Sequence, residues 1–393
     1  MFGGLLLLLA GLFYLPMTLL APLGESAPVV PVHAEAPGAA AELDFPGYGA
    51  SAIGAVGFPG VLATSGSDKA LPMASITKVI VALTVLEKHP LAPDETGPSV
   101  TMTADDERYY AEYRAMNGKV APVRSGQVYT QRELLQLALI ESANNYSTSL
   151  VVWAFGSEQA FIAAATEWIA ARDLPTVRVV DSTGLGSDNR ASASDLVELG
   201  RLALADPIVR EIVATEELQI QGVGQVENTN ELLGRDGVSG IKTGTLDSFG
   251  ANLLFSADYL IGSTSVTAVG VVLGGTDHPT LNRAIRDLLQ TVEAGFHELD
   301  VSDAGEPFGS YATPWGQTAE AQAGAEATLL TWSDTPVTVE VTIEPVRLAE
   351  AGTRVGEAVF TAGERSVTVP LVLSDALTDP GPGWRLTHPA ELF

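Results

Sequence analysis

Pro72-Met-Ala-Ser-Ile-Thr-Lys-Val-Ile-Val-Ala-Leu-Thr-Val-Leu-Glu87 has a serine and a lysine three residues apart at the start of an otherwise apolar segment. Apolar residues recur at helical spacing from Ile76 onward, which predicts a helix that ends before Pro90. Residues i and i+3 share one face of a helix, so the Lys78 amine can reach the Ser75 hydroxyl. A lysine whose pKa is lowered by desolvation or by a second cation can accept the serine proton. The free N–H groups at the helix start can hold a developing oxyanion.

The Ser-x-x-Lys spacing is informative only on a helix, because Ser239-Gly-Ile-Lys242 has the same spacing. Val238 to Lys242 is expected to be a strand, where residues i and i+3 point to opposite faces. Two further motifs support the first pair. Ser142-Ala-Asn144 follows a helix whose start is predicted by the capping-box pattern Thr130-Gln-Arg-Glu133, and Lys242-Thr-Gly244 is expected at a strand end. Ser-x-x-Lys, Ser-x-Asn and Lys-Thr-Gly together are typical of penicillin-binding proteins and class A β-lactamases.

Composition excludes several other classes of function. The net charge is −27, with 48 acidic and 21 basic residues, so the surface repels phosphate backbones and nucleic acid is not an expected partner. The chain has no cysteine, which excludes disulfides and thiolate chemistry. The five histidines stand singly, without the spacing that presents two ligands on one helix face. We therefore expect no metal site and no cofactor.

The N-terminal segment, residues 1–24, is predicted to be a signal peptide or a membrane anchor. No residue from Phe2 to Leu23 is charged, and a run of this length can span a membrane as a helix. Pro16 and Pro22 interrupt the run, and no lysine or arginine precedes Lys69. We favour an uncleaved anchor over a cleaved signal. The expected location is extracytoplasmic, in the cell envelope, with the chain anchored at its N-terminus or secreted.

The rest of the chain is predicted to form a linker and two domains. Residues 25–44 are rich in alanine and proline and indicate a linker. Residues 45–300 combine strands and helices, and we expect one antiparallel sheet with helices, completed by an N-terminal hairpin. Residues 301–393 contain strictly alternating segments and are predicted to form a small β domain. The expected elements are two strands within 48–63, a helix starting at Ser192, strands at 251–257 and 265–273, a helix over 281–299, and strands at 337–343 and 367–373.

The motifs and their order resemble the serine-type D-alanyl-D-alanine carboxypeptidases, which are low-molecular-mass penicillin-binding proteins. The resemblance extends over about residues 48–299 and includes 72–78, 134–145, 181–190 and 240–244. It implies an α/β (α+β) fold of the penicillin-binding/β-lactamase-like class, followed by a small β domain. Asp181 to Arg190 is interpreted mainly as a structural turn, because its glycines and its Asp and Asn residues are common turn formers.

The resemblance implies catalytic roles for the first two motifs. Ser75 would attack the carbonyl between the last two D-alanines of a peptidoglycan stem peptide and form an acyl-enzyme. Lys78 would act as the base for this attack. Ser142 would relay a proton to the leaving D-alanine, and Asn144 would orient Lys78 or the substrate amide.

The third motif is expected to bind the substrate. By the same resemblance Lys242 would supply positive charge for the terminal carboxylate, and Thr243 and Thr245 would donate hydroxyl hydrogen bonds to it. Gly244 belongs to the same substrate-binding strand, and the backbone N–H groups of Ser75 and Thr245 would form the oxyanion hole. Some relatives place a basic residue just beyond Lys-Thr-Gly, whereas this chain has Thr-Leu-Asp-Ser there. The identity of the group that binds the carboxylate is therefore open.

Two other functions compete with a carboxypeptidase acylated by penicillins and other β-lactams. A β-lactamase is the nearest enzymatic alternative, but the second motif is Ser-Ala-Asn where class A enzymes usually have Ser-Asp-Asn. No glutamate can be assigned to deacylation either. The other alternative is a non-catalytic cell-wall binding protein, which would need neither Ser75 nor Lys78. The choice between carboxypeptidase and endopeptidase action stays open.

Overall fold

The computed structural model describes residues 12–31 and 40–392, and it divides the chain into two compact units. The large unit comprises Ala41–Gly295, and the small unit combines Phe296–Phe393 with the N-terminal residues up to Ala40. Each unit has its own hydrophobic core. Residues 1–11 of the expected membrane segment lie outside the described residues. In the described ranges no helix has the length and apolar character needed to cross a membrane.

The large unit is built on a five-stranded antiparallel sheet in the order β2-β1-β11-β10-β9. The N-terminal hairpin completes the sheet, as the sequence predicted. It pairs with the last strand of the unit, and Ile53 lies opposite Gly270. Both strands of the hairpin were expected within residues 48–63, but the second strand begins only at Ala63, the last residue of that range. The strands are β1 (Ala50–Ala55), β2 (Ala63–Gly66), β9 (Val238–Leu246), β10 (Gly250–Ile261) and β11 (Thr264–Gly275).

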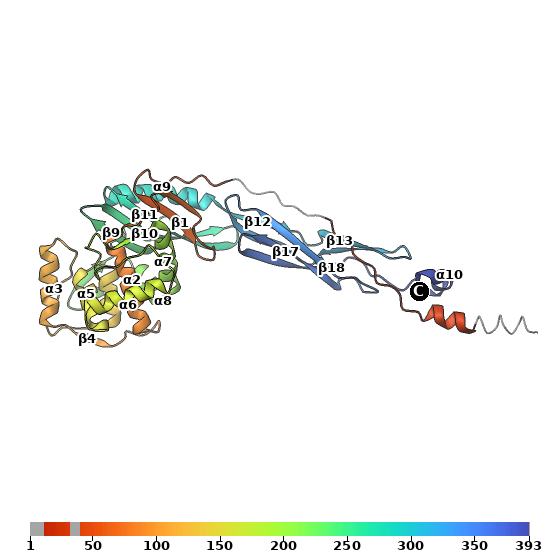
Figure 1. The fold of residues 1–393 in the computed structure, drawn as a ribbon, viewed down its shortest axis with the longest axis horizontal. Helices are drawn as coiled ribbons and strands as arrows, with labels where there is room; N and C mark the ends of the chain where they lie inside the picture. The colour runs from red at the N-terminus through yellow and green to blue at the C-terminus, as the bar shows by residue number, and fades with distance from the viewer. Residues whose placement is uncertain (1–11, 32–39, 393) are drawn as a thin grey trace, which may run out of the picture. The chain divides into compact units, whose positions relative to one another are not determined.

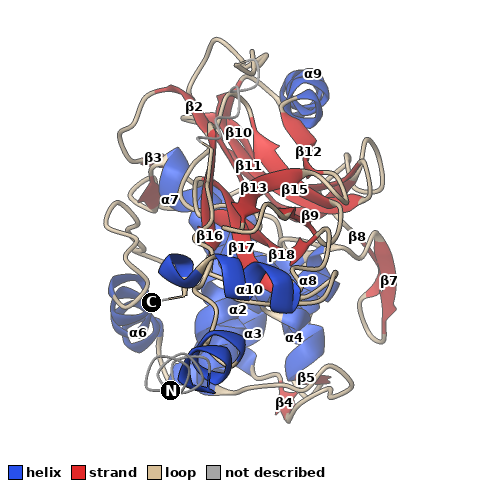
Figure 2. Cartoon of the chain, turned by 90° about the vertical axis from the view of Figure 1, so that its right-hand side faces the viewer, coloured by secondary structure: helices blue, strands red, loops and turns tan. Residues whose placement is uncertain are grey.

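Helices cover both faces of this sheet. Helix α9 (His278–Ala294) lies on one face against β10 and β11, while α7 (Ala193–Ala205) packs on the other face against β1 and β11 (Figure 1, Figure 2). The other helices in this unit are η1 (Ala74–Ile76), α2 (Thr77–Lys88), α3 (Ala104–Ala115), α4 (Gln131–Leu139), α5 (Asn144–Phe155), α6 (Glu158–Ala170) and α8 (Pro207–Val213). Of these, η1 and α8 contact β9 of the sheet. The segments between the helices also form three short two-stranded sheets. These pair β3 (Leu71–Pro72) with β6 (Arg190–Ala191), β4 (Ser99–Thr101) with β5 (Val128–Thr130), and β7 (Glu217–Ile220) with β8 (Gly224–Glu227).

Helix α2 is the central helix of the large unit, which explains its apolar sequence. Every residue from Thr77 to Leu86 is buried, and the helix contacts α4, α5, α6 and α7. The predicted helix and its end before Pro90 are confirmed. Ser75 lies in the 3-10 turn η1 that leads into α2, so the serine is at the entrance to a helix whose body is held rigidly in the core.

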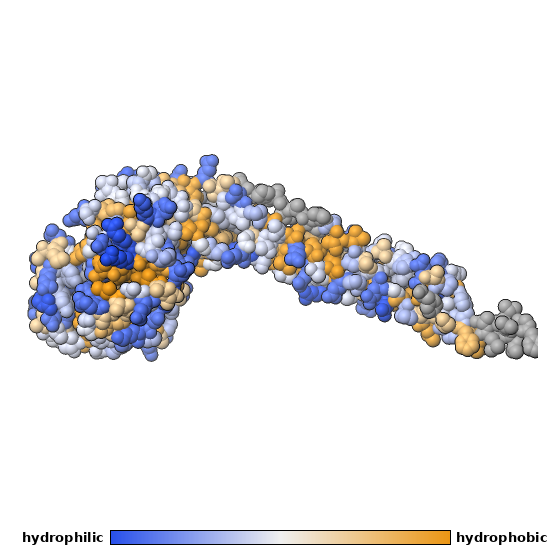
Figure 3. Space-filling model, viewed as in Figure 1, coloured by the Kyte–Doolittle hydropathy of each residue, from blue (hydrophilic) through white to orange (hydrophobic). Residues whose placement is uncertain are grey.

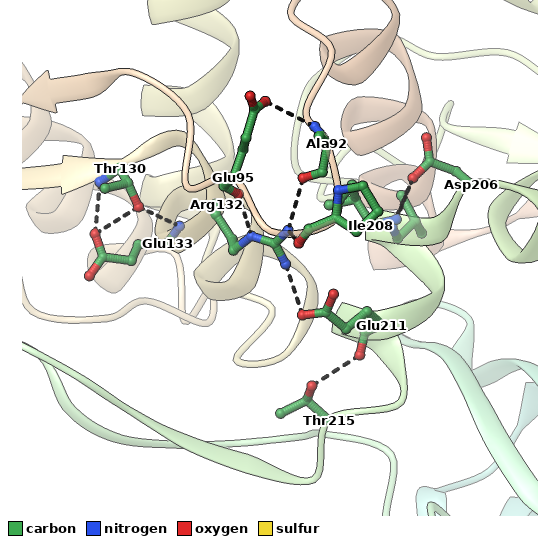
Figure 4. Close-up of polar contacts among 11 residues, drawn as sticks. Ala92, Glu95, Thr130, Arg132, Glu133, Asp206, Ile208, Glu211 and Thr215 are labelled. Atoms are coloured by element: carbon green, nitrogen blue, oxygen red, sulfur yellow. Dashed lines mark hydrogen bonds and ion pairs between the residues drawn. The ribbon is translucent and has the colours of Figure 1, made fainter.

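Helix α4 begins with the predicted capping box. Thr130 Oγ1 accepts a hydrogen bond from the Glu133 N–H, and the Glu133 carboxylate accepts one from the Thr130 N–H at 2.7 Å (Figure 4). The adjacent Arg132 donates to the Glu95 carbonyl at 2.8 Å and pairs with Glu211 of α8 at 2.8 Å. These contacts tie the start of α4 to a neighbouring loop and helix, and its far end leads to Ser142.

Two expected boundaries in the large unit are wrong. The helix predicted over 281–299 ends at Ala294, because Gly295 terminates it and the chain continues as strand β12 (Phe296–Ser302), where Phe296 packs on Trp332. Lys242-Thr-Gly244 does not stand at the end of a strand, since β9 continues to Leu246. The continuation is held by full pairing with β10, in which Thr245 is opposite Ala251.

The small unit contains a five-stranded antiparallel sheet in the order β13-β14-β18-β17-β16 and a two-stranded sheet of β12 and β15. Its strands alternate between buried and exposed residues, as expected for a sheet with one buried face. The bounds are β13 (Pro307–Ala312), β14 (Thr318–Ala323), β15 (Ala327–Trp332), β16 (Val337–Ile343), β17 (Arg354–Ala362) and β18 (Arg365–Leu373), followed by α10 (Gly381–Thr387) and η2 (Pro389–Glu391).

The N-terminal segment packs against this β domain. Ser26 and Val29 form β-bridges to Val346 and Ser310, so this part of the expected linker is ordered on the domain. Arg385 of α10 donates to the Ala21 carbonyl at 2.7 Å. The chain is therefore attached to the β domain from residue 21 to residue 29.

Residues 12–19 form a helix with exposed apolar side chains. Leu12, Phe13 and Met17 are 69%, 68% and 57% exposed, and Leu20 just beyond the helix is 81% exposed. Apolar side chains are therefore exposed on this short helix, and Figure 3 shows hydrophobic residues in orange on the surface of the chain.

Candidate active site

Lys78 and Ser75 lie within hydrogen-bonding distance in the large unit. Lys78 Nζ is 2.9 Å from Ser75 Oγ, 2.7 Å from Asn144 Oδ1 and 2.7 Å from the Thr183 carbonyl oxygen. The last two atoms can only accept hydrogen bonds. A neutral lysine amine has two N–H groups, and these two acceptors use both of them. The lone pair of the amine then faces the Ser75 hydroxyl, which is the arrangement that a general base requires.

The environment of Lys78 favours this neutral form. The side chain is fully buried, with 0% exposure. Burial holds the pKa of Lys78 well below its usual range, and the positive charge of Lys242 lowers it further, while Asp181 raises it. Desolvation dominates because a buried ammonium loses its hydration shell.

Ser142 lies in the turn between α4 and α5, and Asn144 is the first residue of α5. Ser142 has φ of +60°, the left-handed conformation that is uncommon for residues other than glycine. The turn is held by the Ala143 N–H, which donates to Leu137 O at 3.0 Å, and by the Asn144 N–H, which donates to Lys119 O at 2.8 Å. The backbone thus keeps Ser142 in a strained conformation beside the Ser75–Lys78 pair.

Strand β9 contributes Lys242 to the same region. This lysine is 1% exposed, and among the described residues its Nζ has no hydrogen-bond partner. Burial lowers the pKa of Lys242 to about 7, with a smaller contribution from Lys119 and an opposing one from Glu141. A buried cation without a partner favours the binding of an anion.

The two threonines of β9 are held by side chains from other segments. Thr243 Oγ1 is 2.6 Å from Thr229 Oγ1, and Thr245 Oγ1 is 2.7 Å from His278 Nε2. Both hydroxyls are therefore oriented before any substrate binds.

Gly244 allows β9 to approach the serine closely. A Cβ atom at this position would lie 2.8 Å from Met73 O and 3.0 Å from Ala74 Cβ, which is closer than such atoms normally come. Only glycine fits, and the strand consequently runs beside the 3-10 turn that carries Ser75. This brings the backbone of Thr245 toward the nucleophile.

The predicted residues surround one cavity of about 920 Å³. Six of them line it: Ser75, Ser142, Asn144, Thr243, Gly244 and Thr245. The other two, Lys78 and Lys242, are buried and do not line the cavity. Ser239, the serine of the second Ser-x-x-Lys match, does not line the cavity, and its Oγ pairs with Ser256 Oγ at 3.0 Å. The structure thus brings together residues that are up to 170 positions apart in the sequence.

Sequence reasoning missed the contribution of the turn at Asp181 to Arg190. Thr183 O accepts a hydrogen bond from Lys78 and lies 3.4 Å from Ser75 Oγ. The Asp181 carboxylate holds this turn by accepting from the N–H groups of Thr183, Gly184 and Gly186 and from Asn189 Nδ2. Burial alone would raise the pKa of Asp181, but these hydrogen bonds lower it overall. The family resemblance of the segment was the available signal, although it was assigned to structure.

Thr229 and His278 were also missed. Both line the cavity, and each touches a threonine of β9. Neither belongs to a recognisable motif, so the sequence carried no signal for them.

Comparisons with known proteins agree with this geometry. The sequence profile of the D-alanyl-D-alanine carboxypeptidase family matches residues 59–276, more than half of the chain. A D-alanyl-D-alanine endopeptidase of Pseudomonas aeruginosa is 32% identical over 158 residues, which is 40% of this chain and 47% of the relative. D-alanyl-D-alanine carboxypeptidase DacB2 of Mycobacterium tuberculosis is 30% identical over 191 residues, 47% of this chain and 61% of the relative. The matched region thus spans about half to three-fifths of these relatives.

The fold has solved counterparts. A peptidoglycan synthesis regulatory factor (PBP3) from Streptococcus pneumoniae superposes with a TM-score of 0.61 at 19% identity, covering 86% of this chain and 100% of that one. At this identity the likeness shows the fold alone. It confirms the predicted penicillin-binding class of fold, an antiparallel sheet with helices followed by a β domain.

Proposed function

The chain belongs to the D-alanyl-D-alanine carboxypeptidase family, and on this premise we propose that it is a serine peptidase that removes the terminal D-alanine of peptidoglycan stem peptides. One observation carries the proposal: the Nζ of Lys78, fully buried, lies 2.9 Å from Ser75 Oγ. A non-catalytic binding protein gains nothing from a desolvated lysine beside a serine hydroxyl, whereas acyl transfer requires this pair.

Acylation begins when Ser75 Oγ attacks the carbonyl carbon between the two D-alanines. The hydroxyl proton moves to Lys78 Nζ as the Oγ–C bond forms, and the carbonyl becomes an oxyanion. The N–H groups of Ser75 and Thr245 stabilise this oxyanion, a role supported by the close approach of β9 that Gly244 permits.

The tetrahedral intermediate collapses when the C–N bond breaks. The leaving D-alanine nitrogen receives a proton through the Ser142 hydroxyl, and Asn144 keeps Lys78 in position through their 2.7 Å hydrogen bond. A water molecule then attacks the ester carbonyl, the C–Oγ bond breaks, and one proton of the water restores the Ser75 hydroxyl as the shortened peptide leaves with a new carboxyl group. No cofactor takes part in this scheme.

Lys242 and the hydroxyls of Thr243 and Thr245 bind the terminal carboxylate of the substrate. The support is electrostatic. The chain carries a net charge of −27, and Lys242 is a buried cation without a hydrogen-bond partner among the described residues. An anionic substrate end would otherwise be repelled by such a protein.

Benzylpenicillin and other β-lactams are expected to acylate the same serine. The test is the intact mass of the full chain over time with benzylpenicillin, beside Ser75→Ala, together with an assay of D-alanine release. A long-lived adduct that is absent from the Ser75→Ala variant, with D-alanine released from a D-Ala-D-Ala peptide, supports the proposal. Rapid loss of the adduct would instead indicate a β-lactamase, and no adduct and no release would indicate a binding protein.

We further propose that the protein acts outside the cytoplasm, attached to the membrane through its N-terminal segment. The support is the uncharged run from Phe2 to Leu23 and the exposure of Leu12, Phe13 and Leu20. We expect the full chain to sediment with phosphatidylcholine vesicles, whose headgroups carry no net charge, and Phe13→Asp with Leu20→Asp to weaken this strongly. Equal sedimentation of both proteins would contradict the proposal.

A further inference from the structure

The carboxylate end of the cavity contains few basic groups. The residues that follow Thr245 on β9 provide none, and Asp247 and Glu231 line the same cavity. Lys119 also lines it, but this side chain pairs with Glu141 at 3.4 Å. Lys242 is buried beneath the surface, and its pKa is lowered to about 7. A substrate that ends in a carboxylate needs a further positive partner here.

His278 occupies the required position. It is the first residue of α9, lines the cavity, and places Nε2 at 2.7 Å from the hydroxyl oxygen of Thr245. Its side chain is half-buried, so it is reachable from the cavity while its ring is held in place. The strand hydroxyl and the imidazole therefore form a pair that can face one ligand group together.

Charged groups from three segments act on this imidazole. Burial lowers the pKa of His278, and Lys242 on β9 lowers it as well. Glu231, from the turn before β9, and Asp277, the N-cap of α9, raise it. The net effect is a pKa below the usual value, so the ring is neutral at pH 7 in the free protein. A carboxylate bound against the ring would favour the imidazolium form.

We propose that His278 and Thr245 bind the free terminal carboxylate of the peptide substrate, and that His278 does so as the imidazolium, so that binding takes up one proton. The inference rests on the proposed release of D-alanine. It adds a specificity-determining residue that the motifs do not contain, and it makes recognition of the carboxylate stronger in mildly acidic surroundings. His278 touches the substrate in this scheme but takes no part in the transfer of the serine proton.

The test compares kcat/KM of wild type and His278→Gln from pH 5 to 8.5, with an N-acylated L-Lys-D-Ala-D-Ala peptide. Both proteins contain Lys78 and Lys242, so a pH dependence of the ratio reports His278 together with its electrostatic effect on Lys242. We expect a ratio of about 10 at pH 5.5, because a hydrogen bond to a charged group is lost, and a fall toward 1 as the pH rises. The ratio of His278→Arg to His278→Gln should stay above 1 without this fall, since arginine keeps its charge.

Two controls separate charge recognition from a structural role. The same peptide with a C-terminal amide lacks the carboxylate, and its ratio should be near 1 at every pH. His89→Gln removes an imidazole from the same unit, where it packs on Trp153 outside the cavity, and should behave as wild type. Melting curves check that each variant is folded, and Thr245→Val tests the pair from the other side with the same expected loss for the free acid.

The outcomes distinguish this inference from the proposed function. Release of D-alanine by wild type with a pH-independent ratio, or an equal loss for the amide peptide, would overturn the role of His278 alone. No release of D-alanine by wild type at any pH would overturn the proposed function and this inference with it.

Discussion

The Cα of Gly184 faces the carbonyl group of Ala74 so closely that a Cβ on Gly184 would lie 2.0 Å from the Ala74 oxygen. The same atom would lie 2.8 Å from the Ser75 nitrogen, and Gly184 has φ of +83°. The turn that supplies the Thr183 carbonyl is thus packed directly against the backbone that carries the nucleophile.

Gly184→Ala is therefore expected to displace Ser75 and to destabilise the fold by about 2 kcal/mol. Acylation by benzylpenicillin should fall at least tenfold in protein that remains folded by circular dichroism. Gly156→Ala is a suitable control, because Gly156 also has a positive φ but meets nothing within 4 Å. If both variants lose acylation equally, the close contact at Gly184 is not what positions the serine.

Lys78→Arg tests the base. Arginine keeps a positive charge at every pH of interest and cannot accept the Ser75 proton, so we expect acylation to fall by about 10²–10⁴-fold. Stopped-flow or intact-mass measurement of the adduct gives the rate. Lys88→Arg, an exposed position on the same helix, should react at the wild-type rate. A Lys78→Arg variant that acylates within a few-fold of wild type would exclude Lys78 as the base.

Ser142 offers a test of strain against function, because φ of +60° is unfavourable for serine and acceptable for glycine. Ser142→Gly and Ser142→Ala both remove the hydroxyl, and both should lose D-alanine release. Only the glycine variant relieves the backbone, so it should be more stable than the alanine variant by about 1 kcal/mol. Denaturant unfolding measures this difference. Equal stability would mean that the turn is not strained at this residue.

The alkaline limb of kcat/KM is expected to reflect Lys242. Its pKa of about 7 means that the cation loses its proton as the pH rises through 7, and binding of the substrate carboxylate weakens. The acid limb has the opposite sign, because Lys78 must be neutral to act as the base. Lys242→Arg remains charged, so its alkaline limb should move to higher pH. An unchanged limb in this variant would assign the limb to another group.

Local sequence predicted α2, α4, α7 and α9 and the antiparallel sheet, but it did not predict α3, α5, α6 and α8 individually. The capping box at Thr130 and the apolar spacing from Ile76 predicted α4 and α2 because hydrogen bonds and side-chain contacts within one turn determine a helix start. The predicted ends of the helices and strands were less accurate. Gly295 ended α9 five residues early, since the strand pairing of Phe296 with Trp332 is a contact between distant residues.

The candidate catalytic residues could be identified from the sequence because Ser-x-x-Lys, Ser-x-Asn and Lys-Thr-Gly are each short motifs of neighbouring residues. The sequence by itself thus determined the family and the nucleophile to test. Only the tertiary structure decided which groups surround that nucleophile. The Thr183 carbonyl oxygen accepts a hydrogen bond from Lys78, although Thr183 follows Lys78 by 105 residues in the sequence. His278, the first residue of α9, contacts Thr245 of β9. Such contacts arise from the packing of distant elements, and no local pattern of residues encodes them.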